Sequence, residues 1–401
     1  MYFPIICVII TMYNYMLMPK GNGDTMIKIL HTGDIHLDSP FSRLDVRRAE
    51  TRKNELRAAF VTMMSWAKKN AVDIILIAGD LFDSEFVTRE TVGLIVREAR
   101  NSDAEIFIAA GNHDPLSDTS VYVKEGIFPP NVHIFKSEEL EKISVDRLGV
   151  DVYGYSFETN YMYENPIKDR HVEDETRLNI LVGHADCRSA DSPYCPVNEE
   201  MVKAFGADYT AYAHLHNAPE PRKIGNAAWA FCGCLEGRDF GECGPKGALM
   251  VEAEKKDGIC TLTARRLRFS KRRYETGELS VEGAVSRDEI MAKINEYITE
   301  KGYGEETLLS LTLRGRIPST LILNTEAMAS EITGLFYFEL TDGTRPDEGA
   351  EELSGDGTVR GQFYRELEDL LTSGDPELRE RGERALRYGL AALSGENLTD
   401  F

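Results

Sequence analysis

The 401-residue sequence has little positive charge and few cysteines for its length. Its 46 Lys and Arg stand against 67 Asp and Glu, so the formal charge is −21, which disfavours a nucleic-acid protein of the uniformly basic kind. Any contact with DNA would have to be local or supplied by a partner. The seven cysteines lack the paired spacing of a structural zinc site, which fits reduced thiols in a cytoplasmic protein.

A long hydrophobic run is also missing, except in the first 18 residues. That run has no basic residues before it and no small-residue cleavage site before Lys20, so it is a poor secretion signal. Pro4, Asn14 and several tyrosines interrupt it, so it is also a poor membrane span, and we expect no membrane association. A start assigned too early, with Met26 opening the first strand, is as well supported as a retained N-terminal extension over residues 1–25.

Short β-rich runs of four to six residues fill the chain from residue 26 to about residue 254. The helical spacing of Leu56, Phe60, Met63 and Ala67 predicts a helix between the first two runs. Strands that alternate with helices early and follow one another later predict an α/β fold, a two-sheet sandwich of mixed sheets flanked by helices. The predicted strands are Ile27 to Thr32, Asp73 to Ala78, Glu105 to Ala110, Val132 to Phe135, Asp151 to Tyr155, Leu178 to Val182, Tyr209 to Ala213, Ala228 to Cys232 and Ala248 to Glu252.

The pattern changes near Ser270 to Leu279, where a basic run gives way to a polar stretch that contains glycine. This change predicts a domain boundary close to residue 275. Beyond it, Ser286 and Glu289 form a capping-box pattern that opens a helix, and two strands with a helix between them follow. Residues 276–345 are therefore expected to form a small second α/β domain.

The C-terminal part of the chain, residues 346–401, is acidic and helical in pattern. It carries 6 basic and 14 acidic residues, so its charge is −8. Two helices are expected, around Gln362 to Leu371 and Pro376 to Leu393. The second has Asp375 as its N-cap and Pro376 at its first helical position.

Side chains of catalytic type directly follow five of the predicted strands. Ligands bind beyond the carboxyl ends of strands in α/β sheets, so these segments are expected to converge on one site. Asp34 and His36 are expected to alternate on a strand and to point to the same side, as are His214 and His216. The segments are Gly33-Asp34-Ile35-His36, Gly79-Asp80-Leu81-Phe82-Asp83, Gly111-Asn112-His113-Asp114, Gly183-His184-Ala185-Asp186 and Ala213-His214-Leu215-His216.

Seven of these side chains offer oxygen or imidazole nitrogen to a metal, and none offers a thiolate. They are Asp34, His36, Asp80, Asn112, His184, His214 and His216. Mixed ligation of this kind suits Mn²⁺, Fe²⁺ or Zn²⁺. Seven ligands are too many for one ion, so the sequence predicts two divalent cations about 3.5–4 Å apart, bridged by one carboxylate. His31, His133 and His171 are assigned to structure, with His31 close enough to Asp34 for a supporting role.

The five segments resemble the signature blocks of calcineurin-like metallophosphoesterases. The wider strings Ile29 to Leu37 and Ala78 to Asp83 resemble SbcD-type DNA repair exonucleases in particular. The resemblance implies that residues 26–275 form the catalytic domain and that residues 276–345 correspond to that family's capping domain. It also implies a dinuclear metal-dependent phosphodiester hydrolase, an exonuclease or endonuclease subunit that acts on DNA in repair together with a coiled-coil ATPase of the SbcC type.

The resemblance also implies a role for each site residue. It assigns Asp34, His36 and His216 to one metal and Asn112, His184 and His214 to the other, with Asp80 bridging. His113 becomes the proton donor to the leaving oxygen, held by Asp114. Asp83 stands where some relatives have a histidine beside the phosphate, so it is expected to orient a neighbour or a bound water. Mn²⁺ is the expected ion, with Fe²⁺, Zn²⁺ and Mg²⁺ as alternatives. Ala213 replaces the family's usual glycine, and we expect activity to survive this change.

Two basic clusters are candidates for a local DNA contact. They are Arg43, Arg47, Arg48, Arg52, Lys53 and Arg57, and Arg265, Arg266, Arg268, Lys271, Arg272 and Arg273. A solvated helix face is the plainer interpretation of the first cluster, and a charged strand between domains explains the second equally well.

The C-terminal helices are where the resemblance would place an ATPase partner. The amphipathic stretch of Phe363, Leu367, Leu370 and Leu371 fits a helix that docks on such a partner, and equally a helix packed on its own domain. Relatives often form homodimers, which is left open for this chain.

Two other classes of function compete with a DNA nuclease. One is a phosphodiesterase or phosphatase that acts on nucleotides or other small phosphoesters, with the same metals and a narrower cleft. The other is a scaffold without catalytic activity, which is disfavoured because His113 and all seven predicted ligands are present.

Overall fold

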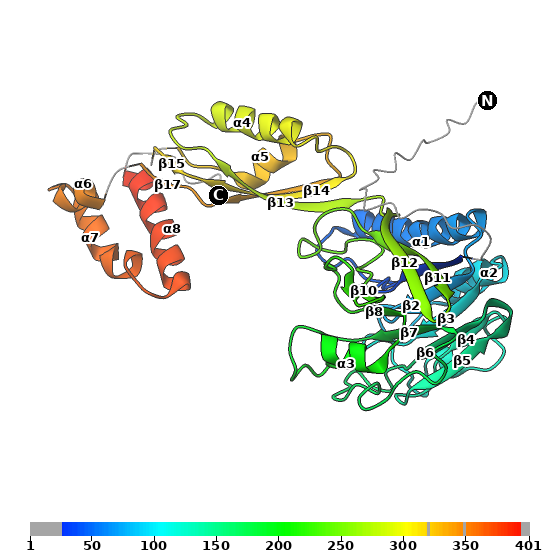
Figure 1. Ribbon diagram of the computed structural model, residues 1–401. Helices are drawn as coiled ribbons and strands as arrows, with labels where there is room; N and C mark the ends of the chain where they lie inside the picture. The colour runs from blue at the N-terminus through cyan, green and yellow to red at the C-terminus, as the bar shows by residue number, and fades with distance from the viewer. Residues whose placement is uncertain (1–25, 319–320, 348–349, 394–401) are drawn as a thin grey trace, which may run out of the picture. The chain divides into compact units, whose positions relative to one another are not determined.

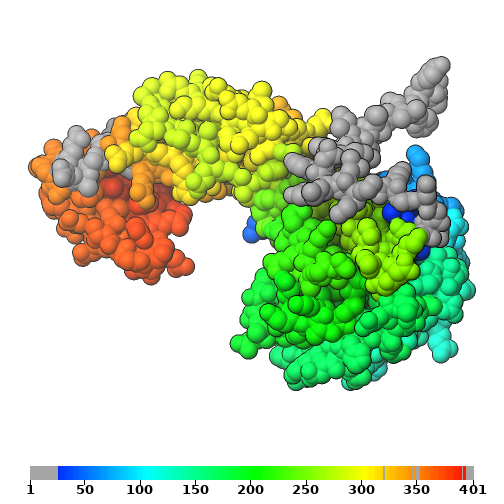
Figure 2. Space-filling model, in the orientation of Figure 1, coloured from blue at the N-terminus to red at the C-terminus, as the bar shows by residue number. Residues whose placement is uncertain are grey.

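The chain divides into two compact units, Met1–Arg273 and Tyr274–Phe401 (Figure 1). The computed structural model describes residues 26–318, 321–347 and 350–393. The space-filling view colours the first unit from blue to yellow-green and the second from yellow to red (Figure 2). The predicted extension over residues 1–25 lies outside the described residues, so the expected early start stays a prediction.

In the described residues, two six-stranded sheets form the body of the first unit. The strands of the first sheet are β1 (Ile27–Thr32), β2 (Ile74–Ala78), β3 (Glu105–Ala109), β4 (Val132–Ile134), β11 (Gly247–Lys256) and β12 (Ile259–Arg268). Those of the second are β5 (Glu141–Val145), β6 (Val150–Gly154), β7 (Leu178–His184), β8 (Tyr209–Ala213), β9 (Arg222–Ile224) and β10 (Ala227–Phe231).

Both sheets mix parallel and antiparallel neighbours. The first has the order β12-β11-β1-β2-β3-β4, with β1 to β4 parallel and β11 and β12 antiparallel to their neighbours. The second has the order β5-β6-β7-β8-β10-β9, with a parallel centre and an antiparallel strand at each edge. The carboxyl ends of the central strands in each sheet therefore point the same way, which is what a site at one edge requires.

Helices cover the outer faces of the two sheets, so the unit is built in four layers (Figure 1). The helices α1 (Val46–Lys69) and α2 (Arg89–Arg100) lie on the first sheet, and α3 (Glu199–Phe205) lies on the second. Along β2, Ile75 and Ile77 pack with the helices, whereas Ile74 and Leu76 face the other sheet. Burial on both faces explains why this strand is a continuous apolar run.

The predicted α/β sandwich is confirmed, and each of the nine predicted runs overlaps a strand. The elements β5, β9, β12, α2 and α3 were not predicted. It was also wrong to treat Ser270 to Leu279 as a break without structure, because residues Arg273–Ser280 form the strand β13 of the second unit. Tyr274 is buried and the residues after it alternate between half-buried and exposed, a two-residue period that the basic charges obscured.

The second unit contains a small α/β core followed by helices. Its first elements are β13, α4 (Arg287–Glu300), β14 (Thr307–Arg314), β15 (Arg316–Ile317), α5 (Thr325–Glu331), β16 (Tyr337–Asp342) and β17 (Arg345–Pro346), and the order β13-β14-β16 forms its main sheet. The capping box is confirmed in part: Ser286 Oγ accepts the Glu289 N–H at 3.3 Å, and Glu289 Oε2 accepts the Val285 N–H at 2.9 Å. The predicted separation of residues 276–345 from 346–401 stays a prediction.

Three helices, α6 (Ala350–Gly355), α7 (Val359–Leu371) and α8 (Pro376–Leu393), end the described chain. Asp375 Oδ1 accepts the Glu377 N–H at 2.9 Å, as expected of an N-cap. The apolar residues of α7 pack in a cluster with α8 that includes Phe363, Leu367, Leu386 and Leu390. Of the two interpretations of this amphipathic stretch, packing within its own domain is therefore the one that the structure contains.

Two further properties concern the whole described chain. In the described residues, no helix combines the length and the hydropathy that a bilayer span requires. The six described cysteines, from Cys187 to Cys260, are free thiols.

The interpretation of the first basic cluster as a solvated helix face is wrong for Arg52. This side chain is buried, and its guanidinium donates to Glu55 Oε2 at 2.9 Å, to Glu236 Oε2 at 2.7 Å and to the Gly237 carbonyl at 2.9 Å. Arg272, from the second cluster, donates to Glu55 Oε1 at 2.6 Å. Burial raises the pKa of Glu55, but the hydrogen bonds from Arg272 and Arg52 outweigh it and lower that pKa to about 2. These arginines therefore hold α1 to the segments that follow β10 and β12.

Replacement of the buried guanidinium should destabilise the first unit. We expect Arg52→Met to lower its free energy of unfolding by about 3–5 kcal/mol, because the change leaves buried carboxylates without their partner. Urea unfolding followed by tryptophan fluorescence measures this, since both tryptophans, Trp66 and Trp229, lie in the first unit. Arg48→Met, on an exposed part of the same helix, is the matched control and should leave the midpoint nearly unchanged. Equal midpoints for the two variants would contradict the role of Arg52.

Candidate metal centre

The five segments predicted to converge do meet at the carboxyl ends of the central strands. Backbone hydrogen bonds join them. The Asp34 N–H donates to the Gly79 carbonyl at 3.1 Å, the His113 N–H donates to Asp80 Oδ1 at 2.9 Å, and the His214 N–H donates to Asp34 Oδ2 at 2.9 Å. The loops after β1, β2, β3 and β8 are thus connected to one another through the two aspartates.

Asp34 and His36 do not alternate on a strand, contrary to expectation, and neither do His214 and His216. Strand β1 ends at Thr32 and β8 ends at Ala213. Asp34, His36 and His214 have φ angles of 45°, 51° and 102°, in the left-handed region that L-residues seldom adopt. The cost of such backbone is accepted mainly where surrounding contacts enforce it, as at binding sites.

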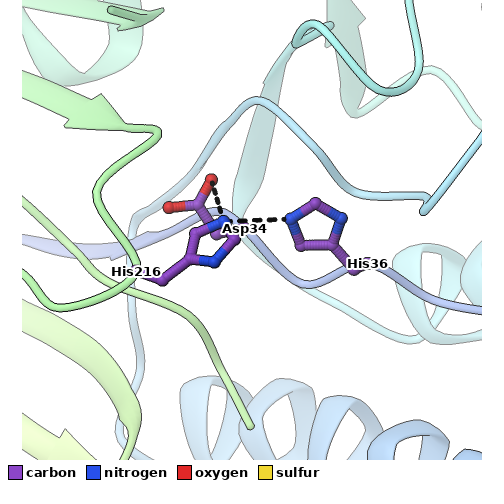
Figure 3. A group of neighbouring side chains, drawn as sticks. All are labelled: Asp34, His36 and His216. Carbon is purple, nitrogen blue, oxygen red and sulfur yellow. Dashed lines mark hydrogen bonds and ion pairs between the residues drawn. The ribbon is translucent and has the colours of Figure 1, made fainter. Parts of the chain in front are cut away.

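Asp34, His36 and His216 form the first group of converging acceptor atoms, and Figure 3 shows their side chains pointing toward one another. His216 Nε2 lies 3.3 Å from His36 Nε2 and 3.9 Å from Asp34 Oδ1. His216 Nδ1 lies 2.6 Å from the Glu242 carboxylate, and His36 Nδ1 lies 3.3 Å from Asp83 Oδ1. Each Nδ1 next to a carboxylate is the natural place for the ring proton, which leaves the Nε2 lone pairs facing inward.

Asp80, Asn112, His184 and His214 form a second group. His184 Nε2 lies 3.4 Å from Asp80 Oδ2, 3.0 Å from Asn112 Oδ1 and 3.2 Å from His214 Nδ1. His184 Nδ1 lies 3.0 Å from the carbonyl oxygen of Ala78, which only a ring proton can satisfy. The lone pair of His184 is therefore on Nε2, and it faces other acceptors.

Asp80 belongs to both groups, since its Oδ2 also lies 3.6 Å from His36 Nε2. Lone pairs that converge from carboxylates, an amide oxygen and neutral imidazoles repel one another, and a divalent cation relieves that repulsion in each group. The residues present therefore fit metal binding. All seven side chains predicted as ligands are brought together.

Burial decides the protonation state of the site. It raises the pKa of Asp34, and it lowers the pKa of His36 far below its usual value and that of His214 to about 3. Burial also raises the pKa of Asp80, but the neighbouring His184 and His36 outweigh it and bring that pKa to about 2. His36 and His214 are therefore neutral at neutral pH, which is the form in which imidazole binds a metal.

Asp83, His113 and Asp114 lie beside the acceptor groups but do not interact as expected. The His113 ring is exposed, and its Nδ1 lies 3.2 Å from the Asp83 carbonyl oxygen. Asp114 is turned away: it accepts the N–H groups of Gly111 and Phe82 and the Tyr122 hydroxyl at 2.6 Å. The expectation that Asp114 holds the His113 ring is therefore corrected, since the oxygens of this buried carboxylate accept other donors and support the loops.

Glu242 and Arg238 are two site residues that were not predicted from the sequence. Glu242 contacts His216, and Arg238 donates to Glu242 Oε1 at 3.1 Å and to Asp83 Oδ1 at 2.8 Å. The guanidinium thus joins the carboxylate beside His216 to the carboxylate beside His36. Both residues follow β10, so the same rule that located the other segments, applied to the end of this strand, could have found them.

Asp186, next to His184 in sequence, is also close to the site. Its Oδ2 lies 3.7 Å from His214 Nε2, and its carboxylate accepts from Arg188 and Ser192. Arg188 Nη2 lies 3.2 Å from His214 Nε2. An exposed arginine thus stands at the outer side of the second group.

Ala213, in place of the glycine usual in the family that the sequence resembles, fits its position. A Cβ added to Gly33 would lie 2.5 Å from the Ala213 Cβ, so the methyl group of Ala213 occupies the space that Gly33 leaves. His31 lies deeper, where its Nδ1 contacts the Tyr209 hydroxyl at 2.8 Å and burial lowers its pKa to about 3. His31 is structural, as predicted, and its contacts are to the second sheet.

Residues 27–218 match the family model of the calcineurin-like phosphoesterases. This range runs from β1 through the segment after β8 and includes every residue predicted for the site. That part of the chain is therefore a calcineurin-like metallophosphoesterase domain, of a class that uses divalent metal ions to hydrolyse phosphoesters.

Similar proteins with curated names include one without an assigned role and two repair proteins. The chain is 28% identical over 244 residues to an uncharacterized metallophosphoesterase, YhaO, of Bacillus subtilis, which covers 58% of this chain and 59% of that protein. It is 24% identical over 260 residues to the SbcD component of the nuclease SbcCD of Staphylococcus epidermidis, 57% of this chain and 66% of that protein. It is 24% identical over 234 residues to the DNA double-strand break repair protein Mre11 of Methanopyrus kandleri, 53% of this chain and 50% of that protein. The matched region thus spans between 50% and 66% of these relatives.

A glycine tests whether the packing behind the second group matters. A Cβ on Gly79 would lie 2.3 Å from His184 Nδ1, and Gly79 has a φ of 98°. We expect Gly79→Ala to push the His184 ring out of place and to weaken Mn²⁺ binding at least ~10-fold, the low end of what displaced supporting contacts cost. Isothermal titration with Mn²⁺ measures this. Gly93→Ala, at an exposed helical position with open space around it, should bind Mn²⁺ normally; weakening in both variants would argue against the packing account.

Proposed function

We propose that this protein is a metal-dependent phosphodiesterase that cleaves DNA. The observation that carries the proposal is the pair of acceptor groups that share Asp80, with the exposed ring of His113 beside them. Two of the named relatives are a nuclease component and a double-strand break repair protein, which supports DNA as the substrate.

Each acceptor group would hold one divalent cation, with Asp80 between them. Asp34, His36 and His216 would hold the first, and Asn112, His184 and His214 the second. Mn²⁺ suits this oxygen and nitrogen donor set, and Fe²⁺, Zn²⁺ and Mg²⁺ are alternatives. When bound, the two cations would supply an activated water and offset the charge of the phosphoryl oxygens.

His113 would give its proton to the leaving oxygen. Its Nδ1 is held by the Asp83 carbonyl at 3.2 Å, so its Nε2 can carry the proton that is delivered. The Asp83 carboxylate would not touch phosphate, because it lies between Arg238 and His36 and orients the latter. Asp114 would keep the loops after β2 and β3 in place through the Phe82 and Gly111 N–H groups.

Most of the affinity for DNA would come from a partner. Arg52 and Arg272 are used in internal ion pairs, and Arg57 pairs with Asp38 at 2.8 Å, so these members of the basic clusters are held within the protein. One relative is named as part of the two-component nuclease SbcCD. A coiled-coil ATPase of the SbcC type, in the cytoplasm, is accordingly part of the proposal, with a homodimer of this chain as a further assembly.

Hydrolysis of linear DNA against small esters tests the proposed substrate and the role of His113 together. With Mn²⁺, we expect cleavage of linear DNA, and we expect His113→Ala to reduce it at least ~100-fold while Mn²⁺ stays bound, because a general acid contributes that much or more. The matched control is His171→Ala, an exposed histidine outside the site. Hydrolysis of bis-p-nitrophenyl phosphate or cyclic nucleotides without cleavage of DNA would favour a small-phosphoester hydrolase instead. An undiminished rate for His113→Ala would remove this residue from the mechanism.

The number of cations is a separate prediction. Metal analysis after dialysis against Mn²⁺ should find two ions per chain. Because Asp80 belongs to both acceptor groups and His216 to one, Asp80→Asn should lower binding at both sites, whereas His216→Asn should leave about one ion bound. One ion or none in the unmodified protein would refute the dinuclear centre.

A further inference from the structure

An open cleft of about 420 Å³ adjoins the site on the side of His113. Its size is that of a pocket for a small organic group. The residues that line it are Asp83, Ser84, Glu85, Phe86, Asn112, His113, Asn160, Tyr161 and Tyr194. The cleft thus begins at His113 and Asn112 and extends away from the acceptor groups toward a set of aromatic rings.

The charge of the cleft wall disfavours a phosphate. All nine lining residues lie in the described part of the chain, and they include two carboxylates, Asp83 and Glu85, and no lysine or arginine. Glu85 is fixed in place, since its Oε2 accepts the Ser117 hydroxyl at 2.5 Å. The group that enters should therefore be uncharged, with hydrogen-bond donors, and the next phosphate of a chain should lie elsewhere.

The aromatic side chains of the cleft are unusually open to solvent. Phe86 is 87% exposed and Tyr161 is 51% exposed. The rings of Tyr161 and Tyr194 are stacked, with centroids 6.0 Å apart, and the Tyr194 ring lies 5.0 Å from that of His214. A planar ring system that entered here would cover apolar surface that water now covers, and it would do so next to the site.

The Tyr161 loop is attached to the metal-binding side. Asn160 Nδ2 donates to the Asn112 carbonyl at 2.7 Å, and Thr159 Oγ1 donates to the Tyr161 carbonyl at 2.8 Å. These bonds hold the tyrosine at a set distance from the proposed metal ligand Asn112. A ring stacked on Tyr161 would therefore belong to the same nucleotide as, or the nucleotide next to, the phosphate that is cleaved.

We propose that this cleft binds an unpaired nucleobase of the substrate, between Phe86 and the Tyr161 ring. A base is planar and uncharged, every base has a face that stacks on aromatic rings, and an exocyclic amino group can donate to Glu85. A base paired in a duplex cannot enter, so the cleft selects single-stranded DNA or a frayed end. This inference rests on the proposed function and adds the form of DNA on which the site acts.

The test uses first-turnover cleavage of two single-stranded oligonucleotides that differ only in their ends. One carries bases throughout, and the other carries abasic units over the last three positions at both ends. Phe86→Ala and Tyr161→Ala should each lower the rate constant for the first by about 5- to 150-fold, which corresponds to the ~1–3 kcal/mol of one stacked base. They should leave cleavage of the abasic ends unchanged, and the unmodified protein should cleave abasic ends more slowly than normal ends. Tyr163→Ala is the matched control, since Tyr163 is 70% exposed, stacks beside Tyr161 and does not line the cleft.

The outcomes separate this inference from the proposed function. Equal rates on the two oligonucleotides, with Phe86→Ala and Tyr161→Ala as active as Tyr163→Ala, would overturn base binding while DNA cleavage stands. Hydrolysis of bis-p-nitrophenyl phosphate with no cleavage of either oligonucleotide would overturn both. Thermal midpoints and Mn²⁺ titrations equal to those of the unmodified protein would confirm that the exposed substitutions leave the fold and the site intact.

Discussion

The convergence of lone pairs on the Asp80 carboxylate is the constraint around which the first unit is arranged. Oδ1 accepts the His113 N–H, and Oδ2 faces the imidazoles of His36 and His184. A buried carboxylate among other acceptors is costly unless positive charge compensates it, so the protein must hold these groups together against their repulsion. The left-handed backbone at Asp34 and His36, and the supporting carboxylates behind the rings, show where that force is resisted.

Much of the fold and the membership of the site could be predicted from sequence because both depend on local patterns. Strands buried on two faces are continuous apolar runs, as in β2, and residues of ligand type follow them within a few positions. The orientation of Asp34 and His36 could not be predicted in this way. The His36 N–H and the Ile35 N–H both donate to the Asp80 carbonyl, and these bonds to a distant segment set the backbone angles.

The errors share the same origin, which is a partner far away in the sequence. Arg52 has the surroundings of a solvated residue in its own helix, but its carboxylate partner Glu236 is 184 positions further along the chain. Arg238 likewise connects Asp83 to Glu242, and the first of these contacts spans 155 positions. The acidic net charge also changes meaning in this light, because part of the positive charge is spent inside the protein and the cleft beside His113 carries negative charge of its own.

The contact between Gly33 and Ala213 sets how closely the loops of the two sheets approach. The Ala213 methyl group fills the space where a Gly33 side chain would stand, with only 2.5 Å to an added Cβ. The contact therefore has room for one carbon atom, which either loop can carry but not both. Related chains with glycine at the position of Ala213 can accept alanine at the position of Gly33, so these two positions, 180 residues apart, are expected to vary as a compensating pair.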